Sequence, residues 1–438
     1  MPRIHDERIR ARGTRFALYP QAPVLKAVEL ETVWVSPPPG SIGPGPRDDR
    51  MHVVDAIGKT QYELDAPPYR GPANPPVAPG RDGHFDHLRP GDQGFAAAHM
   101  YGSIRRVLDI WEGYFGRPIA WYFRDRFERL ELVPWVDWDN AHSGPGFIEM
   151  GYAETEDGAR HPHYLNFDVL AHELGHTILF SELGVPAPGA VTPEYRGFQE
   201  SGADLFAIVA ALHFDSVVDR VLRTTHGNLY TLNELTNVGE LSETEQIRVA
   251  GNAYRMSEVP DPRLPLSALT QPDIHRLGEP LTGAIFDIFV ETFQADLVAA
   301  GLISDDLAAM SYGIPANPQH LDAVARGFAR AYRDRHEEFK AVLLGARDYL
   351  GALLVGTWAR LSPNFLHFAE VARALISADR DLTAARRQRI IRESLAWREI
   401  RLPMDARNVA NPAASGAWNL RSLPYRERWR LAREGLPY

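Results

Sequence analysis

The stretch Asp168-Val-Leu-Ala-His172-Glu173-Leu-Gly-His176 lies near the middle of the chain and carries two histidines four positions apart. On a helix, residues at this spacing lie on the same face, one turn apart. Both imidazoles can therefore reach a single metal ion, and the intervening glutamate projects beside it.

This pattern is the H-E-x-x-H zinc arrangement, in which the glutamate acts as general base for an attacking water. The runs on either side, 166–171 and 177–180, are mostly apolar and predict a buried helix. Imidazole and carboxylate groups on a buried face need partners, and a zinc ion satisfies them. The alternative is a helix with two surface histidines and a chance glutamate, because the chain contains 16 histidines.

A second helical run, 195–212, carries Glu200 and Asp204 four positions apart and hence on one face. Two carboxylates on an otherwise apolar helix are costly unless they are paired or bound to metal. We therefore expect Glu200 to be the third zinc ligand. Asp204 is then the expected acceptor for the ring N–H of a ligand histidine. The alternative is that both acids stabilise the N-terminal turn of the helix through its dipole.

The composition describes a globular chain with a large core. Its 438 residues suggest one to three domains, and 45% apolar with 24% charged residues is typical of soluble proteins. The net charge of −10 is spread along the chain and argues against a nucleic-acid partner. There is no cysteine, so a zinc site must use histidine and carboxylate ligands.

The N-terminal sequence and the hydropathy of the chain indicate the cellular compartment. The N-terminus lacks the apolar region of a secretory signal, and no run of about 18 apolar residues occurs. We therefore expect a cytoplasmic protein without a membrane span. The sequence does not indicate an oligomeric state.

Residues 1–95 are rich in proline and glycine, with strand-like runs such as 30–35 and 52–56 between the prolines. Proline is confined to strand edges and turns, so we expect short antiparallel strands joined by long ordered loops. A partly disordered leader is the alternative.

The character of the sequence changes near residue 96. Apolar residues at helical spacing run from there to a stop at Gly116. The runs 119–123 and 130–136 predict strands. Asn140 and Ala141 then lead through a turn into an expected edge strand.

H-E-x-x-H followed by a helix with E-x-x-x-D resembles the gluzincin zinc metallopeptidases, which include the thermolysin-like and fungalysin-like families. Two histidines and one glutamate are thermolysin's own ligand set. The resemblance implies a two-lobed α+β fold, with an N-terminal mixed β-sheet lobe, the zinc helix in the cleft and a mainly helical C-terminal lobe. We expect four segments: 1–95 with short strands, 96–185 with the substrate strand and zinc helix, 186–400 mainly helical with the third ligand, and 401–438 as a wrapping tail.

Further residues match the family pattern. Asn140 and Ala141 resemble the pair whose side chain and backbone hold the peptide substrate. His275 resembles the histidine that stabilises the oxyanion, and Asp273 its orienting partner, although their spacing is short. The alternative for His275 is that it caps a helix.

Two matches depart more from the pattern. Arg255 resembles the arginine that binds a substrate carbonyl, in an ambiguous register. Tyr195 resembles the family's hydroxyl donor, but it lies closer to Glu200 than the pattern predicts.

Asp168 sits where thermolysin has a calcium-binding acid. No matching carboxylate follows Asp204 in this sequence, which argues against a bound calcium ion.

The resemblance implies a zinc metalloendopeptidase with one Zn²⁺ ion and a peptide or protein substrate. One alternative is an aminopeptidase-like hydrolase of narrow specificity, although no G-x-M-E-N-like stretch that would grip a free amine is present. The other is a catalytically silent protein that keeps the zinc fold for binding or as a scaffold. The intact Glu173 argues against the silent protein, because a purely structural zinc has no use for that base.

Overall fold

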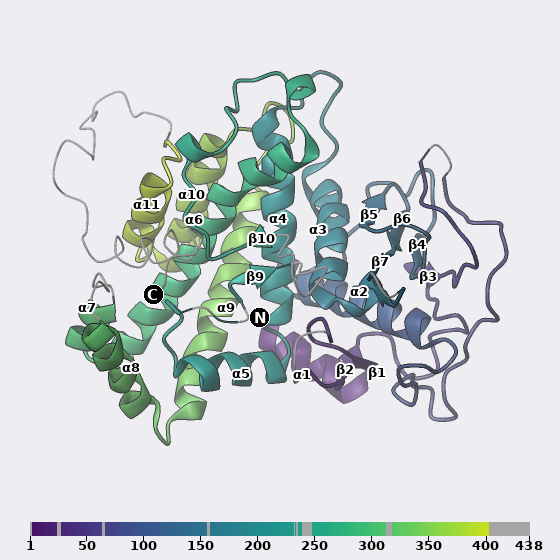
Figure 1. Ribbon diagram of the computed structural model, residues 1–438, viewed down its shortest axis with the longest axis horizontal. Helices are drawn as coiled ribbons and strands as arrows, with labels where there is room; N and C mark the ends of the chain where they lie inside the picture. The colour runs from purple at the N-terminus through teal and green to yellow at the C-terminus, as the bar shows by residue number, and fades with distance from the viewer. Residues whose placement is uncertain are drawn as a thin grey trace. The chain divides into compact units, whose positions relative to one another are not determined.

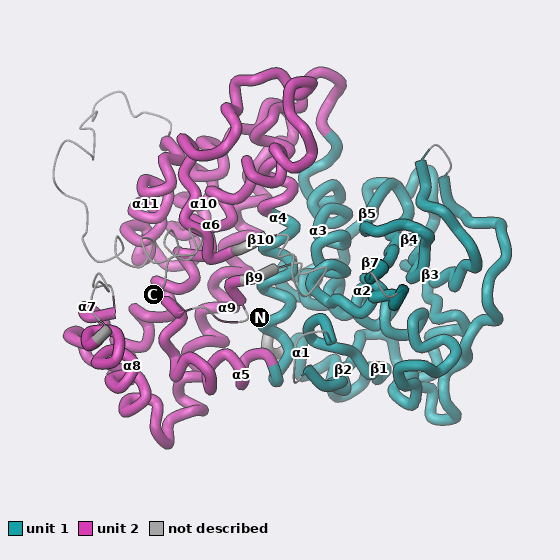
Figure 2. The backbone as a smooth tube through the Cα atoms, in the orientation of Figure 1, with its two compact units in different colours: residues 1–185, 202–216, 238–248 teal, residues 186–201, 217–237, 249–438 magenta. Residues whose placement is uncertain are grey.

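The structure is a computed structural model that describes residues 2–23, 28–63, 66–155, 158–231, 233, 235–238, 248–311 and 318–402. The chain forms two compact units (Figure 2). Unit 1 comprises Met1–Val185, Gly202–Ser216 and Val238–Arg248, and unit 2 comprises Pro186–Ser201, Val217–Asn237 and Val249–Tyr438. The predicted segment boundaries stay predictions, and most of the predicted C-terminal tail lies outside the described residues.

Unit 1 contains most of the strands and two long helices (Figure 1). Its helices are α1 (Pro2–Arg12), α2 (Phe95–Phe115) and α3 (Phe167–Leu183), with a short 3-10 turn at His163–Leu165. Its strands are β1 (Thr14–Leu18), β2 (Glu31–Val35), β3 (Met51–Val53), β4 (Leu130–Val133), β5 (Ala141–Gly144), β6 (Phe147–Met150), β7 (Tyr152–Glu154) and β8 (Arg160–Pro162). The chain is therefore a mixed α+β protein, as predicted.

The largest sheet of the described residues has four strands in the order β3-β4-β6-β5 and lies in unit 1. β4 runs parallel to β3 and β6, whereas β5 pairs with β6 in antiparallel fashion at the edge of the sheet. The predicted edge strand after Asn140 is thus confirmed. The predicted antiparallel pairing within residues 1–95 is confirmed for β1 with β2 but is wrong for β3. β3 joins β4 through a long crossover containing α2, a connection that produces parallel strands.

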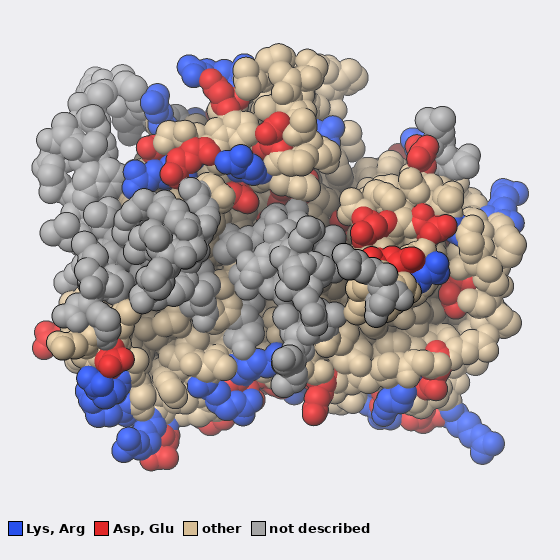
Figure 3. All heavy atoms as spheres, viewed as in Figure 1, with Lys and Arg blue, Asp and Glu red and all other residues tan. Residues whose placement is uncertain are grey.

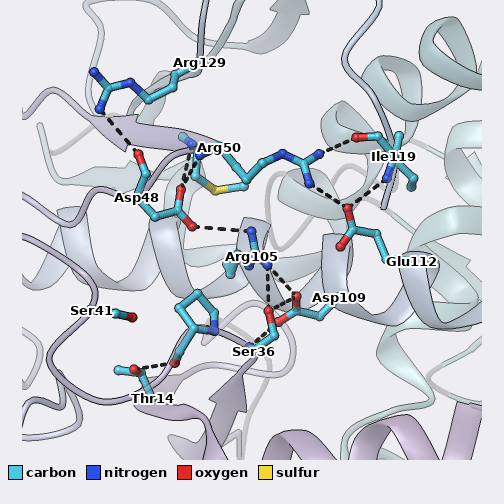
Figure 4. A network of polar contacts seen from close by, with 12 residues as sticks. Thr14, Ser36, Ser41, Asp48, Arg50, Arg105, Asp109, Glu112, Ile119 and Arg129 are labelled. Carbon is cyan, nitrogen blue, oxygen red and sulfur yellow. Dashed lines mark hydrogen bonds and ion pairs between the residues drawn. The ribbon is translucent and has the colours of Figure 1, made fainter. Parts of the chain in front are cut away.

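Helix α2 follows the sequence prediction closely. It ends at Gly116, whose φ of 68° lies in the left-handed region that glycine adopts without strain. Although α2 is largely buried, it carries Arg105, which pairs with Asp109 at 3.1 Å and Asp48 at 3.4 Å (Figure 4). Asp109 also accepts the backbone N–H of Ser36 at 2.6 Å. The proline-rich N-terminal loops are therefore fixed to α2 by buried ionic groups.

The predicted strand over residues 119–123 is wrong. These residues form an extended stretch and a turn, and the side chains of Trp121 and Phe123 are buried without belonging to a strand. The indole N–H of Trp121 donates to the Arg50 carbonyl at 3.1 Å, and the Arg50 guanidinium lies 4.8 Å from the centre of the Trp121 ring. The predicted strand beginning at residue 130 is confirmed as β4.

Unit 2 is mainly helical. Its helices are α5 (Asp215–Thr225, beginning at the end of unit 1), α6 (Gln271–Ala299), α7 (Asp305–Ser311), α8 (Pro318–Tyr332), α9 (His336–Trp358), α10 (Phe368–Thr383) and α11 (Gln388–Trp397), with 3-10 turns at Met256–Glu258 and Leu266–Ala268. Helices α6, α9, α10 and α11 pack on one another and form the core of the unit. The small pair β9 (Asn237–Val238) and β10 (Arg248–Val249) spans the division between the units in sequence.

Unit 2 contains an ion pair that is almost fully buried. Arg398, just after α11, donates to Asp287 on α6 at 3.0 Å, and both side chains are almost fully buried. The same guanidinium donates to the Asn252 side chain at 2.7 Å and to the Tyr254 carbonyl at 3.0 Å. It therefore fixes the segment that precedes α6.

Helix α4 (Pro193–Ala211) belongs to both units, because the division falls between Ser201 and Gly202. None of the helices in the described part of the chain is both long enough and apolar enough to span a membrane. On the face shown in Figure 3, acidic and basic side chains of the described residues are interspersed.

Candidate metal centre

Helix α3 carries the H-E-x-x-H motif. Asn166 caps its N-terminus, accepting the backbone N–H groups of Asp168 at 3.1 Å and Val169 at 3.4 Å. Most of the side chains from Phe167 to Leu179 are buried, as the apolar flanks of the motif predicted. The helix ends before Gly184, which has a φ of 89°.

Helices α3 and α4 approach each other closely because small residues line the crossing. A Cβ atom at Gly175 would lie 3.0 Å from the Cα atom of Ala203. A Cβ atom at Gly202 would lie 2.7 Å from a methyl carbon of Leu179. Glycine permits such backbone contact, so the polar side chains on the two helices can meet.

The three predicted ligands come together where these helices meet. The Nε2 atoms of His172 and His176 are 3.0 Å apart. One ligand atom each from His172, His176 and Glu200 lies within 4.8 Å of the others. Within the described residues, no other group of three or more histidine and acidic side chains comes close enough to share an ion.

Asp204 orients His172, one of the three candidate ligands. The Nδ1 atom of His172 is 2.9 Å from Oδ1 of Asp204, and both side chains are buried. This contact leaves Nε2 of His172 facing His176. Asp204 lies one turn after Glu200 on α4, so one helix supplies both a candidate ligand and the group that fixes another.

A zinc ion fits this set of residues. Zinc–nitrogen bonds of about 2.0–2.1 Å in a tetrahedral site place neighbouring ligand atoms roughly 3.3 Å apart. The observed separation of the two Nε2 atoms is close to this value. A histidine whose other ring nitrogen contacts a carboxylate is also the usual form of a zinc ligand. The candidate ligands are therefore His172, His176 and Glu200.

Glu173 differs from its neighbours on α3. Its residue exposure is 8%, yet its carboxylate makes no hydrogen bond or ion pair with any described residue. The Glu173 oxygens are not among the buried side-chain atoms that lack a partner, so solvent reaches the carboxylate although most of the residue is buried. Its position next to His172 leaves it able to bind a water molecule or a substrate group.

His275 lies in the first turns of α6 and contacts the third candidate ligand. Its Nε2 atom is 3.3 Å from Oε2 of Glu200, and its side chain is 34% exposed. A second close crossing of glycines brings the two residues together. A Cβ atom at Gly278 would lie 2.6 Å from the carbonyl oxygen of Gly197, so α6 and α4 touch through their backbones.

Asp273 is placed as a helix cap. Its Oδ2 atom accepts the backbone N–H and the hydroxyl of Thr270, at 2.9 and 2.7 Å. The Thr270 hydroxyl is the main cause that lowers the pKa of this carboxyl below its ordinary value. Its predicted role as a partner of His275 stays a prediction.

Tyr195 lies on α4, one turn and a residue before Glu200, and is almost fully buried. Its hydroxyl accepts a hydrogen bond from the amide of Gln199 at 2.9 Å. Burial is the main cause that raises the pKa of Tyr195 to about 12. The hydroxyl therefore remains protonated and keeps its own proton available to a further acceptor.

The predicted substrate-binding residues fall in two places. Asn140 is exposed, and its side chain accepts the backbone N–H of Ala141 at 2.8 Å, where the edge strand β5 begins. This strand packs against α3. Arg255 lies beside the 3-10 turn at Met256–Glu258, with its guanidinium 4.5 Å from the centre of the Trp397 ring.

The residues that bring the helices together were not predicted from the sequence. Four glycines lie inside the helical patterns and in the structure mark the crossings: Gly175, Gly197, Gly202 and Gly278. A glycine within a helix is a known sign of close packing, so this signal was available. The partner of each glycine could not be read from the pattern.

We find no protein-family model that matches this chain and no match among curated proteins. Among solved structures, the precursor of protealysin, a metalloproteinase from Serratia proteamaculans, is similar with a TM-score of 0.46 and 15% sequence identity. The match covers 81% of this chain and 88% of the protealysin precursor.

Proposed function

We propose that this protein is a zinc-dependent peptidase of the gluzincin type, which hydrolyses internal peptide bonds. The observation that carries the proposal is the convergence of His172, His176 and Glu200, next to Glu173, whose carboxylate has no hydrogen-bond or ion-pair partner among the described residues. A structural zinc site needs ligands alone. A hydrolytic site also needs a base that is free to act, and Glu173 supplies it.

His172, His176 and Glu200 hold the metal in this proposal, and Asp204 orients His172 through its Nδ1 atom. A zinc ion held by these residues would polarise the substrate carbonyl and promote the ionisation of water. The buried surroundings of His172 and Asp204 limit access of bulk water, which strengthens the electrostatic interactions among these groups.

Glu173 acts as the general base and then as the general acid. Its carboxylate accepts a proton from the attacking water and passes that proton to the amine that leaves. His275 donates a hydrogen bond to the oxygen that becomes negative, a contribution of about 3 kcal/mol for one such donor. The Tyr195 hydroxyl, which keeps its proton, is a second candidate donor.

The peptide binds along β5, the edge strand of the four-stranded sheet. An edge strand offers backbone donors and acceptors to an added strand. Asn140 and the backbone of Ala141 lie at the start of β5 and align the substrate, with Arg255 proposed to bind a substrate carbonyl. The two-lobed thermolysin-like organisation expected from the sequence belongs to the same proposal.

The test compares zinc content and cleavage of casein by the purified protein, with and without a chelator. Glu173→Gln is expected to keep one zinc ion per chain and to lose most casein cleavage. Glu182→Gln, the same change near the end of α3, serves as the matched control and should retain cleavage. Undiminished cleavage by Glu173→Gln would contradict the base assignment, and stoichiometric zinc without cleavage by the native protein would favour the catalytically silent alternative.

A further inference from the structure

One face of the four-stranded sheet carries two completely buried glutamates. Glu131 on β4 and Glu149 on β6 both have side chains with no exposed surface. The register pairs Glu131 with Phe147, two residues before Glu149, so the two carboxylates point to the same face. A buried charge is expensive and persists only where other groups compensate it.

Glu149 is compensated by three donors from separate parts of unit 1. The ammonium group of Lys59, itself buried, lies 2.6 Å from Oε2. The backbone N–H of Tyr62 donates to Oε1 at 2.5 Å, and Nε2 of His142 lies 2.6 Å from the same oxygen. The Glu149 carboxylate therefore connects the loop that follows β3 to strand β5.

Glu131 links the same loop to the sheet. The Tyr62 hydroxyl donates to Oε1 at 2.7 Å, and the backbone N–H of Tyr69 donates to Oε2 at 3.0 Å. Burial works against ionisation, but these bonds and a contact to His52 outweigh it and hold the pKa of Glu131 below its ordinary value. Tyr62 thus bonds to both buried carboxylates. Together these bonds hold the loop after β3 against strands β4 and β6.

His142 connects the buried Glu149 to β5, the strand along which the peptide is proposed to bind. It lies on β5 directly opposite Glu149 in the register of the β5–β6 pair. Its side chain is 33% exposed and packs edge-on against the rings of Trp138, at 5.0 Å, and Phe147, at 5.3 Å. An edge strand of four residues has little intrinsic stability, so a side-chain bond to a fixed partner contributes much to its position.

We infer that His142 is a positioning residue for the peptide substrate. Through its bond to Glu149, which Lys59 anchors, it holds β5 in the register at which a peptide adds to the edge of the sheet. The inference rests on the proposed peptidase function, and it assigns an effect on substrate binding to a side chain that bonds to the sheet.

The physical consequence is a specific kinetic signature. The backbone of β5 binds the peptide in the ground state and in the transition state alike, so a displaced strand weakens both equally. A loss of such uniform binding raises KM and leaves kcat unchanged. A general loss of folded protein would instead lower the apparent kcat, and a disturbed metal site would lower the zinc content.

The test uses two substitutions of His142 in the full chain. His142→Phe keeps an aromatic ring against Trp138 and Phe147 but removes the donor to Glu149. His142→Gln keeps a donor at a similar distance from the backbone. Losing one hydrogen bond of about 1 kcal/mol predicts a KM for a peptide substrate raised roughly fivefold in His142→Phe, with kcat unchanged. His142→Gln is expected to have a KM close to that of the native protein.

Hydrogen–deuterium exchange provides a readout that does not depend on peptidase activity. The peptide covering residues 140–144 should exchange faster in His142→Phe than in the native protein, and His142→Gln should restore protection. Equal exchange and equal KM in all three proteins would overturn the inference. If the native protein lacks peptidase activity but exchange follows this pattern, the bracing of β5 stands while the substrate role and the proposed function both fail.

Discussion

Asp204 is the residue on which the orientation of the candidate metal centre depends. It is buried, and its Oδ1 atom is 2.9 Å from Nδ1 of His172. A carboxylate in this position fixes the imidazole tautomer and raises the basicity of the nitrogen that binds metal. Its influence on zinc should therefore be large although it does not ligate the ion.

We expect Asp204→Asn to weaken zinc binding about 10- to 100-fold, the usual effect of removing such a carboxylate. Competition with a chromophoric chelator at fixed pH measures this change. Asp215→Asn, which alters an exposed aspartate paired with Arg10, is the control and should leave zinc affinity unchanged. Equal affinities in the native protein and Asp204→Asn would contradict the orienting role.

At the scale of single residues, the sequence predicts what the helix geometry dictates. His172 with His176, and Glu200 with Asp204, share faces because of their spacing alone. The surroundings of Arg255 and Asp273 were not predictable in this way. The guanidinium of Arg255 stacks on Trp397, which is distant in sequence, and the Asp273 carboxylate is used by a helix cap. Such contacts depend on tertiary packing.

At the scale of elements, the crossing of α4 and α6 at Gly197 and Gly278 decides where His275 meets Glu200. A helix glycine normally costs about 1 kcal/mol relative to alanine, so replacing one with alanine should stabilise the protein. That gain is available only where the added methyl group has space. At Gly278 it would lie 2.6 Å from a backbone oxygen, whereas at Gly345 on α9 no atom lies within 4 Å.

Replacing these two glycines with alanine is therefore expected to change the free energy of unfolding in opposite directions. Gly345→Ala should raise the free energy of unfolding by up to about 1 kcal/mol. Gly278→Ala should lower it by about 1–3 kcal/mol, because the backbone at the crossing has to separate. Urea denaturation of the two variants measures both effects. Stabilisation by Gly278→Ala would show that the helices do not touch as closely as described.

Some helices and strands could be predicted from sequence patterns, and others could not. The helix ending at Gly116 and the strand beginning at Leu130 were predictable, because periodicity and a glycine stop are local signals. Residues 119–123 were misread, because aromatic residues are buried in strands and in packed loops alike. The parallel pairing of β3 with β4 was also missed, since the choice of partner depends on the crossover and not on either strand.

At the scale of the whole molecule, the N-terminal loops are part of the core of unit 1. His99 on α2 is completely buried, and its Nε2 atom accepts the backbone N–H of Tyr19 at 3.0 Å. Burial lowers the pKa of His99 from its ordinary value of 6.5 to about 4. The folded protein therefore keeps this imidazole neutral under mildly acidic conditions.

This shift predicts a loss of stability in acid. Above pH 6.5 the histidine is neutral in both states and contributes no pH dependence. Between pH 6.5 and about 4 the unfolded chain binds a proton that the folded protein does not, so stability falls as the pH falls. At 1.36 kcal/mol per pKa unit, the full effect is about 3 kcal/mol.

Urea denaturation between pH 7 and pH 4.5 measures this dependence. His99→Gln, which does not titrate but can still accept a hydrogen bond, should show a smaller loss of stability over that interval. The comparison concerns the slope, because the substitution also changes stability at neutral pH. Identical slopes in the two proteins would mean that His99 takes up its proton equally in the folded and unfolded states.

The division inside α4 has a consequence for any attempt to separate the molecule into parts. Unit 1 is assembled from three stretches of chain, and α4 continues from Ser201 in unit 2 to Gly202 in unit 1. A fragment ending at Val185 would retain both histidines of the motif but would lack Asp204 and the Ala203 backbone against which Gly175 packs. A cut after Val185 therefore separates the motif histidines from the carboxylate that orients His172. Metal affinity would then report reassembly when the two fragments are mixed.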